Sequence, residues 1–153
     1  MGIIVSSHPV DILIVEDSAE DLELALRALR KANLASRIEV ARDGQDALDF
    51  LFCTGAHVDR QVEDKPGVVL LDLKLPKVDG LEVLQRLKSD ARTRTIPTVV
   101  LTSSNERADI QKSYELGVNS YVVKPVNFDQ FAAAVQKLGL YWLLLNHRPA
   151  ADA

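Results

Sequence analysis

The chain is 153 residues long, 47% of them hydrophobic and 26% charged, with a formal net charge of −4. These values are typical of one globular domain and leave little room for a second. The negative net charge argues against nucleic acid as a partner, because phosphate binding depends on clustered Lys and Arg. The local basic stretch at residues 86–94 contains no aromatic side chain, so we interpret it as a solvated helix face and loop.

The chain shows no signal for export. Cys53 is the single cysteine, so no internal disulfide can form and a reducing cytoplasm is the expected compartment. No secretory signal or membrane span is visible. We expect residues 1–9 to be a flexible leader, residues 10–146 to form one domain whose last helix extends to about residue 145, and residues 147–153 to be a flexible tail.

Short apolar runs alternate with helical patterns along the chain. The runs predict strands at residues 11–15, 37–41, 68–71, 97–101 and 120–123, and the 3.6-residue patterns predict a helix after each, the third of them over residues 80–89. Capping residues mark the helix starts at Ser18, in a capping-box-like pattern with Asp21, at Asp43, at Ser103 with Glu106, and at Asn127. Right-handed crossovers then predict an α/β fold, a doubly wound five-stranded parallel sheet with five flanking helices. We expect the flavodoxin-like strand order 2-1-3-4-5.

The last predicted helix carries a long apolar stripe. Its members recur in steps of three and four, which predicts a face docked on the sheet: Phe128, Phe131, Val135, Leu138, Trp142 and Leu145. Tyr141, Leu143 and Leu144 lie off that stripe. They predict either extra burial within the domain or contact with another chain, and the sequence leaves both alternatives open.

Polar side chains follow four of the five predicted strands. Glu16 and Asp17 come after the first, Asp72 after the third, Thr102 after the fourth and Lys124 after the fifth. Because parallel strands present their carboxyl ends at one edge of the sheet, these groups should meet there. Each acid alone could merely cap a helix or turn, but capping does not account for the whole set.

Adjacent carboxylates in a dry crevice need a cation, since like charges raise one another's pKa. Mg²⁺ prefers hard oxygen ligands, and Asp17 and Asp72 are the predicted direct ones. With the charge reduced, an Asp carboxylate can attack a phosphoryl group, as Lys124 and the Thr102 hydroxyl neutralise the phosphoryl oxygens.

With these residues in this order, the chain resembles the receiver domain of bacterial two-component response regulators, from about Val10 to Leu140. The ordered set of motifs carries the resemblance: Val15-Glu16-Asp17, Leu71-Asp72-Leu73-Lys74-Leu75-Pro76 with Asp79-Gly80, Thr102-Ser103, and Tyr121 through Lys124-Pro125.

The resemblance implies a phosphorylation switch rather than an enzyme. It makes Asp72 the phosphoacceptor for a sensor histidine kinase, with Glu16, Asp17, Asp72 and the Lys74 carbonyl holding Mg²⁺, for which Mn²⁺ could substitute. It also implies that Thr102 moves onto the phosphoryl oxygens while Tyr121 turns inward, the alternative being a Tyr simply packed at a strand edge. The same resemblance predicts a cis Lys124–Pro125 bond, although only about 5% of such bonds are cis.

A narrower resemblance is to the single-domain regulators paired with bacterial and cyanobacterial phytochromes. The long loop at residues 54–67 and the Tyr141-Trp142-Leu143 ending carry it. It implies a phytochrome kinase as partner and a homodimer through the fourth helix, fifth strand, fifth helix and apolar C-terminal end. We expect output by protein contact, with neither nucleic acid nor membrane as partner.

Two rivals remain. A phosphohydrolase of the haloacid dehalogenase type would also use an Asp nucleophile and Mg²⁺, but its Asp-x-Asp motif fails because Lys74 stands two residues after Asp72. A degenerate receiver would bind partners without being phosphorylated, although all five expected active-site positions are filled here.

Overall fold

The computed structural model describes residues 10–34 and 37–149, so the predicted leader and residues 150–153 of the predicted tail lie outside it. The five strands form one parallel sheet in the order β2-β1-β3-β4-β5, which confirms the prediction. The strands are β1 (Ile12–Val15), β2 (Ile38–Ala41), β3 (Val68–Leu71), β4 (Thr98–Thr102) and β5 (Ser120–Val123).

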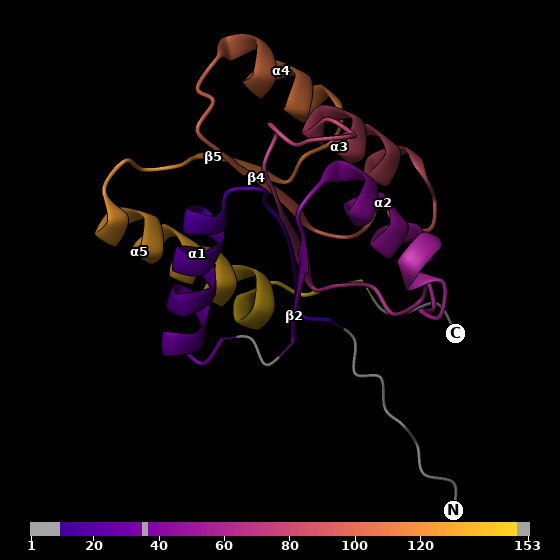
Figure 1. The fold of residues 1–153 in the computed structure, drawn as a ribbon, viewed down its shortest axis with the longest axis horizontal. Helices are drawn as coiled ribbons and strands as arrows, with labels where there is room; N and C mark the ends of the chain where they lie inside the picture. The colour runs from indigo at the N-terminus through magenta and orange to yellow at the C-terminus, as the bar shows by residue number, and fades with distance from the viewer. Residues whose placement is uncertain (1–9, 35–36, 150–153) are drawn as a thin grey trace, which may run out of the picture.

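Helices cover both faces of this sheet (Figure 1). On one face α1 (Ala19–Lys31) lies beside α5 (Phe128–Gly139), and the other face carries α2 (Gly44–Phe52), α3 (Gly80–Ser89) and α4 (Arg107–Glu115). None of the helices in the described ranges is long and apolar enough to span a bilayer. The helices α1 to α4 each form the crossover that connects two parallel strands, and α5 follows the last strand, so the alternation of elements dictates the doubly wound architecture.

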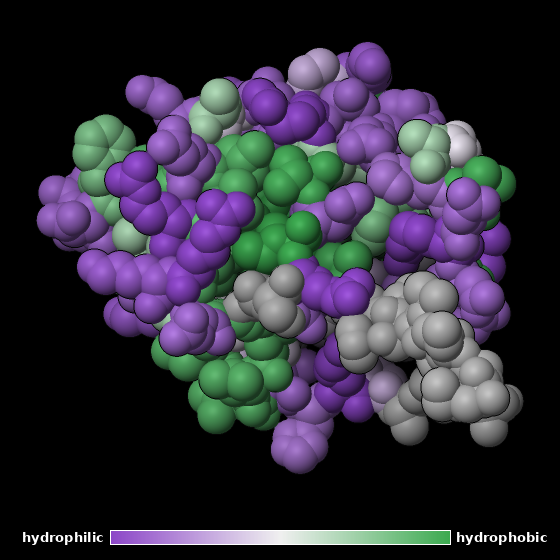
Figure 2. Space-filling view, turned by 60° about the horizontal axis from the view of Figure 1, so that its bottom comes forward, coloured by the Kyte–Doolittle hydropathy of each residue, from purple (hydrophilic) through white to green (hydrophobic). Residues whose placement is uncertain are grey.

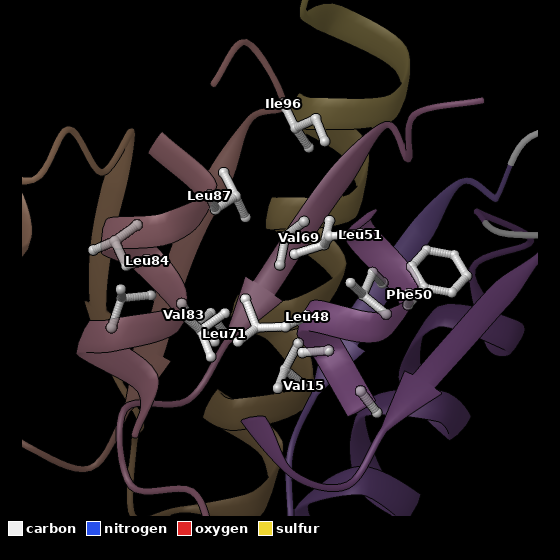
Figure 3. Close-up of a cluster of buried hydrophobic side chains, with 14 of the residues drawn as sticks. Val15, Leu48, Phe50, Leu51, Val69, Leu71, Val83, Leu84, Leu87 and Ile96 are labelled. Atoms are coloured by element: carbon white, nitrogen blue, oxygen red, sulfur yellow. The ribbon is translucent and has the colours of Figure 1, made fainter. Parts of the chain in front are cut away.

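The central strands are buried on both sides, and successive side chains serve two different cores. In β1, Leu13 and Val15 join the core under α2 and α3, whereas Ile12 and Ile14 join the core under α1 and α5. Figure 3 shows the first of these cores, where Leu48 and Leu84 face β3 side chains such as Leu71. Burial on both faces explains why these strands are continuous apolar runs rather than alternating ones.

Three of the predicted helix caps are confirmed. The side chains of Ser18, Asp43 and Asn127 accept hydrogen bonds from backbone N–H groups in the first turns of α1, α2 and α5. The capping box of Ser103 with Glu106 is wrong, because Glu106 is itself the N-cap of α4 and makes no side-chain cap bond. The Glu106 N–H instead donates to the Ser104 hydroxyl, 3.4 Å away. Ser104, and not Ser103, is therefore the serine that contacts the residue at the start of α4.

The C-terminal end departs from the predicted stripe. Beyond Gly139 the helix continues as a π-helical segment, η2 (Leu140–Leu145). Trp142 is buried against the α1–α5 core and Leu143 packs on it, but Phe128 and Leu145 are both 67% exposed, so the predicted docking of these two is wrong. Three other apolar side chains of η2 are also exposed, Leu140, Tyr141 and Leu144, as is Val126 just before α5. Figure 2 shows hydrophobic surface gathered among hydrophilic side chains on the face that it presents.

The long loop after α2 is an ordered structure. It contains a short 3₁₀ turn, η1 (Gly55–His57), and is held by the guanidinium of Arg60, which stacks 3.6 Å from the centre of the Phe50 ring. That guanidinium also donates to the Phe50 and Asp64 carbonyls. The half-buried guanidinium of Arg60 therefore fixes the loop to α2, together with side-chain bonds from Thr54 to Asp49 and between His57 and Asp46.

The prediction that the basic stretch at residues 86–94 is a solvated face is wrong for Lys88. Lys88 points inward at the far end of the sheet, where its ammonium donates to the Arg94 and Ile96 carbonyls and to Asn119 Oδ1. Burial lowers the pKa of Lys88 to about 8. This lysine therefore ties α3 to the starts of β4 and β5 and is not part of a solvated face.

Candidate functional site

The sheet brings the predicted polar residues to one edge. Val15 pairs with Leu71, so Glu16 and Asp72 are the next residues of neighbouring strands, and the Asp72 N–H donates to the Val15 carbonyl at 3.0 Å. On the other side the Lys124 N–H donates to the Thr102 carbonyl at 2.7 Å. Backbone pairing therefore places these residues side by side at the same edge of the sheet.

The ammonium of Lys124 is the centre of the cluster. It lies 2.6 Å from Glu16 Oε1, 2.8 Å from Asp21 Oδ2 and 3.0 Å from Asp72 Oδ2, and the Lys124 side chain is only 8% exposed. Burial alone would lower the pKa of Lys124, but the bonds to Asp21 and Glu16 and the charge of Asp72 raise it above its usual range. All three N–H donors are occupied, so the charge is fixed in place.

Asp21 is the site residue that the sequence interpretation missed. Its position three residues after Ser18 predicted a helix cap, and its N–H does donate to the Ser18 hydroxyl at 3.3 Å. The carboxylate, however, points to Lys124, and Glu16 Oε2 accepts from the Ser18 N–H instead. A helix that begins directly after β1 carries its first turn over the carboxyl ends of the strands, and this was the available signal.

The two buried acids respond differently to the same surroundings. Burial, with the charge of Asp72, raises the pKa of Glu16 to about 7 against the opposing bond from Lys124. Burial also opposes the ionisation of Asp72, but the charge and hydrogen bond of Lys124, helped by the Thr102 hydroxyl, lower its pKa below the usual value. At neutral pH Asp72 is therefore an ionised, desolvated carboxylate with an oxygen available as a nucleophile.

Glu16, Asp17 and Asp72 offer a divalent cation one oxygen each, and these three atoms lie within 4.8 Å of one another. Asp17 is exposed while the other two are buried, so the group opens to solvent on one side. Hard carboxylate oxygens with room for waters suit Mg²⁺ or Mn²⁺. The residues present fit such an ion, and the Lys74 carbonyl follows Asp72 by two residues on the same loop.

A close backbone approach shapes the loop that carries Asp72. The Gly80 N–H donates to the Leu73 carbonyl at 2.9 Å, and a side chain at Gly80 would place its Cβ 2.4 Å from the Asp72 carbonyl oxygen. Only glycine fits at this helix start. The Asp79-Gly80 motif therefore keeps α3 packed directly against the phosphoacceptor candidate.

Thr102 and Tyr121 flank the site at the β4 and β5 ends. Thr102 is fully buried and its hydroxyl accepts from the Ser104 N–H at 3.4 Å. Tyr121 is partly buried and its hydroxyl donates to the Ser104 carbonyl at 2.8 Å. Both predicted switch residues thus contact the same residue of the loop between β4 and α4.

The prediction of a cis Lys124–Pro125 bond is wrong, since the described part of the chain contains no cis peptide. With the trans bond the Lys124 ammonium already reaches three carboxylates. The trans form is also favoured by about 0.5–1 kcal/mol before any tertiary contact is made. Delivery of the ammonium to the site therefore does not require the rarer isomer.

A doubly wound sheet with an acidic cluster, a buried lysine and a hydroxyl at its carboxyl edge has the architecture of a receiver domain. The chain belongs to the response regulator receiver domain family, whose model matches residues 12–136. Receiver domains bind divalent metal and interact with sensor kinases.

Three relatives are close over nearly the whole chain. Response regulator Rcp1 of Synechocystis sp. is 38% identical over 95% of this chain and 97% of its own length, and its Mn²⁺-bound crystal structure has a TM-score of 0.85, covering 93% of this chain and 100% of that one. The phosphorylated cyanobacterial phytochrome response regulator RcpA is 36% identical, with a TM-score of 0.86 over 94% of this chain and 100% of that one. The bacteriophytochrome response regulator RtBRR is 54% identical, with a TM-score of 0.73 over 94% and 86% of the two chains. The narrower resemblance to phytochrome-associated regulators is confirmed.

Proposed function

We propose that this protein is a cytoplasmic signalling switch that accepts a phosphoryl group on Asp72 from a sensor histidine kinase. The observation that carries the proposal is the ionised Asp72 carboxylate held 3.0 Å from the Lys124 ammonium, beside Glu16 and Asp17. The phosphorylated form of the relative RcpA supports it.

The transfer follows from these positions. An Asp72 oxygen forms a bond to phosphorus as the bond from phosphorus to the kinase imidazole breaks, and that nitrogen keeps the electron pair. A divalent ion held by Glu16, Asp17, Asp72 and the Lys74 carbonyl would draw charge from the phosphoryl oxygens. Lys124 and the Thr102 hydroxyl supply the remaining neutralisation, because phosphoryl transfer depends mainly on positioning and electrostatics. Thr102 and Tyr121 then change position together through their shared contacts with Ser104.

The test is incubation of the protein with acetyl phosphate and Mg²⁺, followed by intact-mass measurement. We expect one added phosphoryl group, and no addition when EDTA replaces Mg²⁺. A protein that stays unmodified would instead support the degenerate receiver that only binds partners. Multiple turnover of acetyl phosphate without a trapped adduct would favour the phosphohydrolase.

The kinase that we propose as donor is a phytochrome. Support comes from RcpA, a cyanobacterial phytochrome response regulator, and RtBRR, a bacteriophytochrome response regulator, which both match nearly the whole chain. A panel of sensor kinases from the host, compared by transfer rate, tests this pairing.

We further propose that the protein forms a homodimer through α4, β5, α5 and the apolar C-terminal end, and that output proceeds by protein contact. Exposed apolar side chains on β5 and at the C-terminal end support this, among them Val123 at 40% and Leu144 at 65% exposure. We expect a dimeric mass by light scattering at high concentration, and a monomeric mass for Leu144→Asp. Val58→Asp, a change at an equally exposed site on another surface, serves as the control. A monomeric wild-type mass both with and without phosphorylation would contradict the proposal.

A further inference from the structure

Lys124 is anchored from three separate elements. Glu16 stands at the end of β1, Asp72 at the end of β3, and Asp21 in the first turn of α1. An ammonium has three donors and four freely rotating bonds behind it, so the number of acceptors decides how narrowly it is placed. Glu16 and Asp72 lie next to each other on neighbouring strands and contact it from the sheet, whereas Asp21 contacts it from the helix.

Asp21 is well suited to hold a neighbouring group. Its backbone is fixed by the Ser18 cap, and the helix that carries it packs through Leu22, Ala25 and Leu29 on the sheet. Its carboxylate lies 2.8 Å from Lys124 and is one-third exposed, so it accepts a bond without being buried among the other acids. Glu16 and Asp72, by contrast, are both committed to the candidate metal group.

We propose that Asp21 is a positioning residue for phosphoryl transfer, which holds the Lys124 ammonium from the α1 side so that its other donors face Glu16 and Asp72. This rests on the proposed function of Asp72. Once the Asp72 oxygen carries a phosphoryl group, the donor that faced it meets a phosphoryl oxygen, while the bond to Asp21 keeps the ammonium at the same place. Without Asp21 the third donor turns to water and the ammonium occupies a wider range of positions.

The test compares three variants with the wild type. Asp21→Ala removes the anchor, and Asp21→Asn keeps an acceptor oxygen and the shape of the side chain. Glu20→Ala removes another acid of the same first turn, which is exposed. We expect Asp21→Ala to be phosphorylated by acetyl phosphate about tenfold more slowly at saturating Mg²⁺, because small displacements of a catalytic group are costly. Asp21→Asn should lose about half of that effect and Glu20→Ala none.

A second readout needs neither metal nor phosphorylation. In metal-free protein the ¹H–¹⁵N NMR signal of the Lys124 ammonium should be visible through slow exchange with water, and should broaden in Asp21→Ala but not in Glu20→Ala. A rate for Asp21→Ala equal to or faster than that of the wild type overturns the inference. A slower rate with an unchanged ammonium signal also overturns it, since Asp21 would then act by another route. If the wild type itself takes no phosphoryl group, the proposed function fails rather than this inference.

Discussion

Asp72→Asn is expected to abolish phosphorylation by acetyl phosphate or by a kinase while leaving the fold intact. An amide has no ionised oxygen to attack phosphorus, and no other described carboxylate bonded to Lys124 lies both in the candidate metal group and beside Thr102, as Asp72 does. The substitution is isosteric, and Lys124 keeps its bonds to Glu16 and Asp21. The parallel strands should therefore remain paired as in the wild type.

Intact mass after incubation measures the loss of labelling, and circular dichroism measures the fold. Asp129→Asn, which removes an exposed carboxylate from the start of α5, is the matched control and should be labelled normally. Full labelling of Asp72→Asn would mean that a different residue accepts the phosphoryl group and that the assignment of the site is wrong.

Lys124→Met is expected to have the largest effect on stability. It leaves Glu16 and Asp72 buried with no cation beside them, and breaking a buried ion pair from one side typically costs about 3–5 kcal/mol. The free energy of unfolding, measured by urea titration, reports this loss. Lys112→Met, on the exposed side of α4, is the control and should change the value by less than about 0.5 kcal/mol.

The loss in Lys124→Met should also depend on pH. Without the ammonium, the folded-state pKa values of both acids rise above their unfolded values. The folded state then holds protons that the unfolded chain releases, so the variant becomes progressively less stable from about pH 4 toward neutral pH. Addition of Mg²⁺ at neutral pH should recover part of the lost stability, because the ion replaces the missing positive charge. A deficit that is equal at pH 5 and pH 8 and insensitive to Mg²⁺ would contradict an electrostatic role for Lys124.

Local patterns in the sequence predicted most of the strands and helices of this protein. The strand of residues 120–123 and the helix of residues 80–89 match β5 and α3 in full, since strongly apolar or amphipathic runs bounded by Gly and Pro leave little choice of structure. The right-handed crossovers favoured a doubly wound sheet, and the expected flavodoxin-like order is the one observed. The convergence of Glu16, Asp72 and Lys124 followed from the rule that parallel strands present their ends at one edge.

The sequence predictions were wrong for residues whose contacts with distant parts of the chain compete with local ones. Ser103 with Glu106 fits a capping box in sequence, but α4 has Glu106 as its N-cap, and Ser104, which is hydrogen-bonded to Thr102, accepts the hydrogen bond from the Glu106 N–H. Lys88 appeared to belong to a solvated basic face, but its ammonium points inward to the Arg94 and Ile96 carbonyls and to Asn119 Oδ1, which lie on two separate segments. Phe128 and Leu145 fit the helical stripe, but they lie at the first residue of α5 and the last of η2, where both side chains are exposed.

The sequence by itself determined the secondary structure, the order of the strands and the edge at which the acids and the lysine meet, because these depend on periodicity and chain connectivity. Only the tertiary structure decided that Asp21 turns from its helix cap to Lys124, that Asp72 is ionised while the pKa of Glu16 is raised, and that Lys124–Pro125 is trans. Those outcomes depend on distances of a few ångströms between groups far apart in the chain, and no local pattern contains such distances.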